Sequence, residues 1–308
     1  ETVDELLNSH ASILKQQATS SPDETADCWI RLANSVKLRM AMHIVKRDAS
    51  LAKKWAEEAV ESGVIKTREQ EFYMPAGSAI GQTHPLAGVS EWNDLAPSAS
   101  FVTLLKSLKH PYVDAPNGNE IILFSPNSGD IRSTDGTVTE MGKAIVGIRS
   151  GSKVGAFKGT DNPYISFSRY NDKMLNNAPI YLFKLSEVYF LRAEGALRGW
   201  NMGQGTAESF YNKGVEESAL LESTDPLAET LKTKLAEYLE LEAPVEVVYV
   251  DPTGKTPKET TRTKIGVKWN EGDSNELKLE KIITQKYIAL FPNGFEAWGE
   301  MRRTGYPK

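Results

Sequence analysis

The chain has 308 residues, of which 41 are acidic and 36 are basic, and its formal net charge is −5. Nucleic-acid binding is disfavoured, because phosphate contacts need clustered lysines and arginines, and the longest basic clusters here are pairs such as Lys53–Lys54 and Arg302–Arg303. The single cysteine, Cys28, excludes an intrachain disulfide. No stretch approaches the ~18 consecutive apolar residues that a membrane-spanning helix needs.

Two helices are predicted near the start of the chain. From Asp27 to Lys46, apolar residues recur at steps of three and four, which predicts a helix with one apolar face. That face consists of Trp29, Ala33, Val36, Met40 and Ile44. After RDAS, with Ser50 as the candidate N-cap, the run LAKKWAEEAVESG predicts a second helix that ends at Gly63. So short a connection predicts that the two helices pack antiparallel.

The region from residue 66 to residue 177 has a different character. Gly, Pro, Ser and Asn are frequent there, helical periodicity is weak, and only Ser98–Leu108 predicts a helix. A loop region of this length is unusual in a compact domain and is more often functional than not. We therefore expect residues 66–177 to be a loop-rich region that carries function.

A second helix pair follows this region. The segment APIYLFKLSEVYFLRAEGALRG, with Pro179 in the first turn, places apolar residues from Leu182 to Gly195 on one helix face. The next segment, TAESFYNKGVEES, matches LAKKWAEEAVES position by position. The matched pairs are Ala52 with Ala207, Trp55 with Phe210, Ala59 with Gly214, Val60 with Val215 and Glu61 with Glu216. Small and aromatic residues at these spacings are typical of tetratricopeptide hairpins, so we expect a repeated hairpin with Trp55 and Phe210 in equivalent buried sites.

The remainder of the chain predicts further helices and one small insertion. A helix is predicted over Leu227–Leu241 and another over Asn275–Leu290. Between them, two β-rich runs flank a DPTG turn, which predicts a β-hairpin within Val245–Val267. We expect little other sheet in the protein.

The chain closes with KYIALFPNGFEAWGEMRRTGYPK. After a turn at Asn293–Gly294, a helix over Phe295–Arg303 is predicted, with Phe295, Trp298 and Met301 near one face. We expect these three side chains to be packed inside the protein, and the arginine pair to bind acids such as Glu296 or Glu300. Stacking of the aromatic rings on a ligand is the alternative.

Three blocks carry a family resemblance: YLFKLSEVYFLRAEGALRG, GTAESFYNKGVEES and KYIALFPNGFEAWGEMRRTGYP. Together they resemble the SusD/RagB family, surface lipoproteins of Bacteroidota that capture nutrients, usually glycans, at the outer membrane. The segment WIRLANSVKLRMAMHIVKRDASLAKKWAEEAV is similar to the earlier helix pair of that family. Family members are commonly longer at both ends, and this chain opens with neither a signal peptide nor an initiator Met. We therefore expect a mature form or a fragment that lacks N-terminal and C-terminal parts, in which Cys28 is not the lipid-carrying cysteine.

The resemblance implies both a fold and a function. The implied fold is mostly α-helical: a tetratricopeptide-like scaffold of helical hairpins (an α-α superhelix) with long loops and a small β-hairpin insertion. It would form a single SusD-like domain over residues 1–308, in which the loop-rich region 66–177 binds ligand. The implied function is non-enzymatic capture of an oligosaccharide at the cell surface. The protein would be held at the outer membrane by a lipid anchor alone and would deliver the glycan to a SusC-like TonB-dependent transporter.

The candidate ligand-binding residues are loop aromatics beside polar side chains. Flat rings stack on the apolar faces of sugars, while amides and carboxylates bond the hydroxyl groups. The loop SEWNDL combines both, so Trp92 is the leading candidate. The predicted ligand-binding residues are Trp92, Tyr73, Asn93, Asp94, Glu91 and Trp200, with Tyr164 and Tyr170 as secondary choices. For each ring, the alternative is that it anchors its own loop.

No catalytic residue, cofactor or metal site is predicted. The four histidines are scattered, none forms a metal-ligand spacing with Cys28, and no GxSxG, Walker or dinucleotide glycine pattern is present. Two other functions remain open. One is a helical repeat module that binds a peptide or protein. The other is an α/α-barrel glycoside hydrolase, which would also combine helix pairs with aromatic loops.

Overall fold

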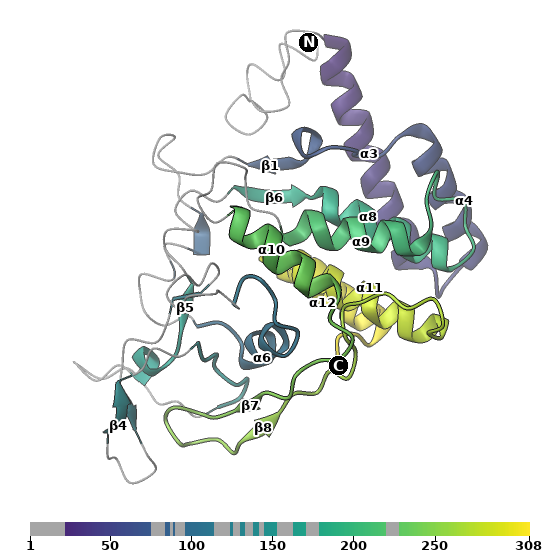
Figure 1. Cartoon of the computed structure of the whole chain (residues 1–308). Helices are drawn as coiled ribbons and strands as arrows, with labels where there is room; N and C mark the ends of the chain where they lie inside the picture. Colours follow the sequence, from purple (N-terminus) through teal and green to yellow (C-terminus); the bar gives the residue numbers. More distant parts are fainter. Residues whose placement is uncertain are drawn as a thin grey trace. The chain divides into compact units, whose positions relative to one another are not determined.

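The computed structural model describes residues 22–74, 84–86, 89, 96–113, 124–125, 130–132, 138–141, 145–152, 163–170, 179–219 and 228–308 (Figure 1). Within these residues the fold is mostly α-helical and tetratricopeptide-like, as predicted. The chain forms two compact units, described separately below. The first unit comprises Glu1–Pro75, Pro179–Asp225 and Val267–Lys308, and the second comprises Ala76–Ala178 and Pro226–Gly266.

The first unit begins with the predicted helix pair, α3 (Pro22–Ile44) and α4 (Ala49–Ser62). The N-cap of α4 is Asp48, whose carboxylate accepts a hydrogen bond from the backbone N–H of Leu51 at 2.9 Å. The prediction of Ser50 as the N-cap is therefore wrong. An N-cap side chain accepts a hydrogen bond from a backbone N–H of the first turn, which has no partner within the helix. Asp48 does this for Leu51, whereas Ser50 lies inside the helix. Gly63 ends α4 with φ at 101°.

The buried face of α3 differs from the predicted one. Leu38, Ala41 and Met42 are fully buried, whereas Met40, on the predicted face, is 50% exposed. The face that packs is set by α4, which contributes Ala52, Ala56 and Ala59, all fully buried. Small side chains allow the two helices to approach closely, and the apolar residues on the other side of α3 stay partly uncovered.

Residues 180–183 form a strand, not the start of a helix. β6 (Ile180–Phe183) pairs antiparallel with β1 (Phe72–Met74), with Phe183 opposite Phe72 and Tyr181 opposite Tyr73. α8 (Leu185–Leu197) begins only after this strand. The predicted helical start at Pro179 is wrong because the β-branched and aromatic run IYLF finds a strand partner far away in the sequence. A short 3₁₀ turn, η2 (Arg68–Gln70), precedes β1.

The second helix pair consists of α8 and α9 (Ala207–Ala219), which lie side by side in Figure 1. Gly214 of α9 permits the close approach, since a Cβ atom there would lie 2.7 Å from a ring carbon of Phe190. Leu38 of α3 and Leu191 of α8 are both fully buried. Phe210 is buried, but Trp55 is half-buried, so their equivalence in the two hairpins stays a prediction.

The first unit closes with α11 (Asn275–Ala289) and α12 (Gly294–Thr304), both close to their predicted bounds. α11 packs against α8, α9 and α12. Ser274 caps the first turn of α11, and Asn293 caps α12 by accepting a hydrogen bond from the N–H of Glu296. Gly305 ends α12 in the left-handed conformation, with φ at 84°.

The second unit contains two helices and short antiparallel strand pairs among the described residues. Its elements are α6 (Ala99–Ser107), β2 (Phe124–Ser125), β3 (Asp130–Arg132), β4 (Val138–Met141), η4 (Pro163–Ser166), β5 (Arg169–Tyr170), α10 (Ala228–Leu239), β7 (Val248–Tyr249) and β8 (Glu259–Thr260). Both helices and the β7–β8 hairpin were predicted. The carboxylate of Asp251 accepts hydrogen bonds from the N–H and hydroxyl groups of Thr253 and Thr256 and so closes the loop after β7. The pairs β2–β5 and β3–β4 add a little more sheet than expected.

Candidate functional site

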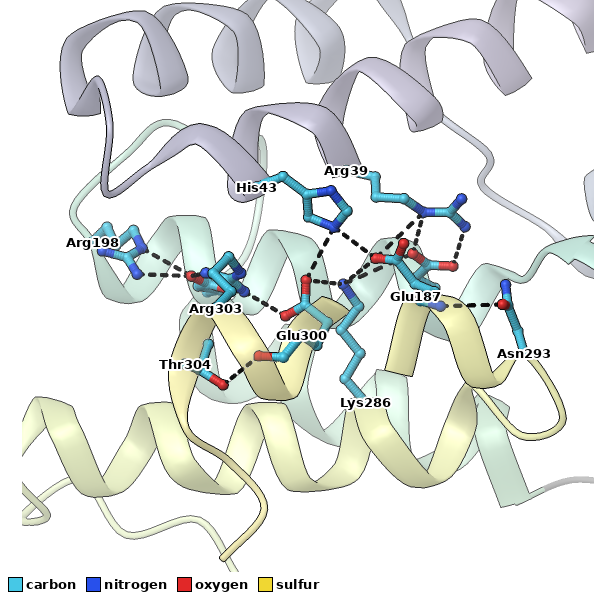
Figure 2. Close-up of polar contacts among 11 residues, drawn as sticks. Arg39, His43, Glu187, Arg198, Lys286, Asn293, Glu300, Arg303 and Thr304 are labelled. Atoms are coloured by element: carbon cyan, nitrogen blue, oxygen red, sulfur yellow. Dashed lines mark hydrogen bonds and ion pairs between the residues drawn. The ribbon is translucent and has the colours of Figure 1, made fainter. Parts of the chain in front are cut away.

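A buried ionic network joins four helices of the first unit (Figure 2). We refer to the residues listed next as the ionic network. Its members are Arg39 and His43 of α3, Glu187, Glu194 and Arg198 of α8 and its C-cap, Lys286 of α11, and Glu296, Glu300 and Arg303 of α12. At one end, the guanidinium of Arg39 donates two hydrogen bonds to Glu187, at 2.7 and 2.6 Å. Two-point pairs of this kind fix orientation as well as distance.

Lys286 lies at the centre of the network and is almost fully buried. Its ammonium nitrogen is 3.2 Å from a carboxylate oxygen of Glu300, 3.7 Å from one of Glu296 and 3.8 Å from one of Glu187. Burial raises the pKa of Glu300, but the charges of Lys286 and Arg303 and a hydrogen bond with His43 outweigh it and hold that pKa below its usual range. Glu300 is therefore ionised and paired with cations.

His43 lies at the solvent-exposed edge of the ionic network. Its Nε2 atom is 2.9 Å from a carboxylate oxygen of Glu296 and 3.5 Å from one of Glu300. Hydrogen bonds with these two carboxylates raise the pKa of His43 to about 9, although partial burial opposes the shift. The imidazole is therefore protonated at neutral pH and adds a positive charge beside α12.

The same three residues also have the composition of a metal site. His43, Glu296 and Glu300 place three potential ligand atoms within 4.8 Å of one another. However, the ammonium of Lys286 already lies beside both carboxylates, and a divalent ion among them would be repelled by that buried charge. The cluster is better explained as a salt-bridge network that attaches α12 to α3, α8 and α11.

Sequence reasoning missed most of this network. It expected the arginines of α12 to pair with acids of the same helix, which Arg303 does with Glu300. The deeper partner is Glu194, which sequence alone did not indicate. A usable signal was present, because Glu187 and Glu194 stand seven residues apart in the apolar helix LSEVYFLRAEGAL. Acids on one face of an otherwise apolar helix need buried partners.

Four of the predicted ligand-binding residues, Glu91, Trp92, Asn93 and Asp94, lie outside the described residues. They stay a prediction.

Tyr73 and Trp200 are described, and both are half-buried. Tyr73 lies on β1 and contacts Tyr181 of β6 edge-to-face, with ring centroids 5.5 Å apart. Trp200 follows the C-terminal end of α8, with the guanidinium of Arg198 5.9 Å from its ring centroid. β6 directly precedes α8, and Trp200 follows the end of α8. The 13-residue helix therefore separates the tyrosine pair from Trp200, and a helix of that length measures about 20 Å at 1.5 Å per residue.

The secondary candidates lie in the second unit. Tyr164 of η4 and Tyr170 of β5 are both half-buried, and Tyr170 stands opposite Phe124 of β2.

In the first unit, Tyr181, which the sequence did not single out, extends the aromatic surface around Tyr73. The ammonium of Lys184 lies 5.0 Å from the centroid of the Tyr181 ring. The cross-strand pair of tyrosines is therefore the best-defined aromatic surface among the predicted positions that the structure describes.

The large apolar side chains of α12 are exposed, although the sequence predicted that they are buried. Phe295 is 93% exposed, Trp298 is 60% exposed and Met301 is 38% exposed. The expectation that they are packed inside the protein is wrong for this chain, because the opposite side of α12 is the one that packs. That side presents Ala297, Glu300 and Arg303 to the neighbouring helices.

The chain belongs to the SusD-like family, because the family model described as "Susd and RagB outer membrane lipoprotein" matches residues 2–308. Among the described residues, no helix is both long enough and apolar enough to cross a membrane. No curated protein sequence matches the chain.

Solved structures of SusD homologues share the fold. A chitin-binding SusD homologue from Flavobacterium johnsoniae is 31% identical, with a TM-score of 0.71 over 99% of this chain and 58% of that chain. A homologue from Bacteroides uniformis is 31% identical, with a TM-score of 0.72 over 99% of this chain and 59% of its own. One from Bacteroides vulgatus is 28% identical, with a TM-score of 0.73 over 99% of this chain and 57% of its own. The chain thus spans a little over half the length of these relatives.

Proposed function

We propose that this protein captures an oligosaccharide without chemically changing it. The observation that carries the proposal is the match of the SusD-like family to residues 2–308, together with the chitin-binding homologue that is similar over 99% of the chain. The ionic network is largely buried, and its charged groups are paired with one another.

The leading proposed ligand site is the loop around Trp92; Tyr73 and Trp200 are proposed ligand contacts as well, and none of the three is assigned to a common site. Sugar binding requires a flat apolar face that can be desolvated and polar groups that keep the hydroxyls hydrogen-bonded. Glu91, Asn93 and Asp94 flank Trp92 and would supply those groups. The half-buried tyrosine pair of β1 and β6 supports an aromatic surface at Tyr73.

The cellular role we propose is delivery of the bound glycan to a SusC-like TonB-dependent transporter by a lipid-anchored protein on the cell surface. Support comes from the family description, which names outer membrane lipoproteins. Co-expression with a SusC-like transporter from the same genome, followed by purification through a tag on the transporter, tests this role. Failure to recover a complex under conditions that preserve the transporter would argue against it.

A glycan array followed by isothermal titration tests the capture function. We expect saturable binding to at least one oligosaccharide class, with no change in the glycan after prolonged incubation at high protein concentration. A parallel peptide library distinguishes the peptide-binding alternative. Release of shorter sugars would instead identify a glycoside hydrolase, and binding to peptides alone would overturn the oligosaccharide proposal.

A further inference from the structure

One face of the β7–β8 hairpin in the second unit carries exposed cations (Figure 1). From residue 258 to residue 265, exposed side chains alternate with covered ones, as they do along a strand with one packed face, and the same alternation runs from residue 246 to residue 251. Val248 stands opposite Thr260 and both are exposed, so the exposed side chains of the two segments share one face. We call it the basic hairpin face, and it consists of Val248, Val250, Lys258, Thr260, Arg262 and Lys264. Glu246 is an acid on the same face.

The opposite face of the hairpin fixes its orientation. Tyr249, Thr261 and Ile265 are buried. The side-chain oxygen of Thr261 accepts a hydrogen bond from the N–H of Val247 at 3.0 Å, and the hydroxyl donates to the Val247 carbonyl at 3.1 Å. Turning the hairpin over would break these contacts and bury charged side chains without partners, which is strongly unfavourable. The cations are therefore held on the outer side.

Positive charge exceeds negative charge on and around the basic hairpin face. Lys258 and Lys264 form no ion pair with any residue that the structure describes. The guanidinium of Arg262 bonds Glu259, and Arg149 contacts the same carboxylate at 3.1 Å, so one acid is shared between two guanidinium groups. The whole chain has a net charge of −5, which makes this excess of cations a local feature.

The cations are spaced for a ligand that runs along the strand. Because a strand rises about 3.3 Å per residue, the backbone positions of Arg262 and Lys264 lie about 7 Å apart, and those of Lys258 and Arg262 about 13 Å apart. An extended ligand with negative groups at intervals can contact all three. The exposed side chains of Val248 and Val250 add an apolar strip beside them, against which the C–H faces of sugar rings can pack. Uncharged residues and Glu259 separate the cations in the sequence, so they do not form a basic run there.

We propose that the basic hairpin face binds the carboxylate or sulfate groups of an acidic oligosaccharide. The inference rests on the proposed capture function and specifies the class of glycan. Ammonium and guanidinium groups form charge-assisted hydrogen bonds with such anions, and a surface patch of one sign attracts ligands of the opposite sign from solution. A neutral glycan gains neither effect, so these cations select for charged sugars.

The test compares an acidic oligosaccharide with its neutral form by isothermal titration at low salt. The probes are oligogalacturonate, its methyl ester, which has the same rings without the charge, and a chondroitin sulfate oligosaccharide as the sulfated arm. Lys258→Gln combined with Lys264→Gln removes two cations of the face. Lys53→Gln combined with Lys54→Gln on α4 is the matched control, since these side chains are 50% and 70% exposed.

We expect the protein to bind at least one acidic probe and to bind the methyl ester more weakly than oligogalacturonate if the carboxylate is the group recognised. The hairpin variant should bind the acidic probe roughly three- to thirtyfold more weakly, the scale of two exposed ion pairs, while the α4 variant binds like the unchanged protein. Added salt should weaken this binding, because it screens exposed charges. Thermal midpoints should not change in either variant, because both lysine pairs are exposed.

The other results overturn the proposal. If neither acidic probe binds but neutral glycans on the array do, the acidic class is wrong and the capture function stands; if no glycan binds at all, both fail. Unchanged affinity in the hairpin variant would mean that the cations only keep this hairpin from pairing with another copy. Single-stranded DNA bound as tightly as the acidic sugar, and weakened by the same variant, would identify a surface for any polyanion instead of a glycan site.

Discussion

Arg303 and Glu194 form a two-point ion pair, with Nη1–Oε1 and Nη2–Oε2 distances of 2.7 and 2.6 Å, between residues that are 109 positions apart in the chain. Both side chains are buried. Arg198 donates to the same carboxylate from the solvent side. The pair thus attaches α12 to α8 and makes the ionic network continuous from α3 to α12.

Removing the guanidinium should destabilise the fold strongly. We expect Arg303→Ala to lower the free energy of unfolding by about 3–5 kcal/mol, because it leaves the buried carboxylate of Glu194 without its two-point partner and removes one of the cations beside Glu300. Arg302→Ala, one residue away but exposed, should change it by less than about 0.5 kcal/mol. Urea denaturation of the two variants gives the comparison, and equal effects would show that the buried pair contributes nothing specific.

The protonated state of His43 should make stability depend on pH. Its folded pKa of about 9 lies above the unfolded value of 6.5, so the stabilisation is fully present below pH 6.5 and is lost as the pH rises through 9. Because the imidazole is more than one third exposed, solvent screening reduces the expected contribution to about 1 kcal/mol.

His43→Gln provides the comparison for this pH effect. The groups that face the imidazole, Arg39, Lys286, Glu296 and Glu300, are unchanged in the variant. The difference in unfolding free energy between the two proteins should be largest at pH 6 and smallest at pH 10. A difference that stays constant over this range, or an NMR titration of His43 with a pKa near 6.5, would contradict the assignment.

Two glycines in helices should respond to alanine in opposite directions. Gly214→Ala places a methyl group 2.7 Å from Phe190 between α8 and α9, and we expect a loss of about 1–3 kcal/mol from overpacking. At Gly299 of α12 a Cβ atom meets nothing within 4 Å, so Gly299→Ala should stabilise by about 0.5–1 kcal/mol through helix propensity. Thermal unfolding measures both changes. Stabilisation by Gly214→Ala would refute the assigned packing of α8 on α9, and destabilisation by Gly299→Ala would refute the open space at that position.

Trp92→Ala should weaken glycan binding with little effect on folding. Stacking contributes about 0.5–1.5 kcal/mol beyond the area buried, and with the lost area we expect roughly tenfold weaker affinity or more. Isothermal titration with the glycan identified on the array measures the affinity, and Trp298→Ala, which removes a tryptophan that is 60% exposed, is the control. If Trp298→Ala lost binding and Trp92→Ala did not, the ligand would stack on α12 instead.

Most helices could be placed from the sequence because their signals are local. Ser98 and Ser274 cap α6 and α11 by accepting from the N–H three residues later, and the spacing of apolar residues marks the helices that follow. The turn that closes the β7–β8 hairpin is equally local, since Asp251 bonds residues two and five positions further on. The sequence blocks that resemble the SusD/RagB family also led to the family that the comparison shows.

Only the tertiary structure decided which side of each helix is buried and which residues share a charge network. Apolar residues occur on several sides of α3, and the alanines of α4 determine that Leu38 and not Met40 is covered. The run Ile180–Phe183 becomes a strand because Phe72–Met74 pairs with it, a contact across more than one hundred residues. Glu194 and Arg303 likewise meet only when α12 folds onto α8. Burial and ion pairing depend on residues that are distant in the chain. A local sequence pattern does not show which distant segment will pack against it.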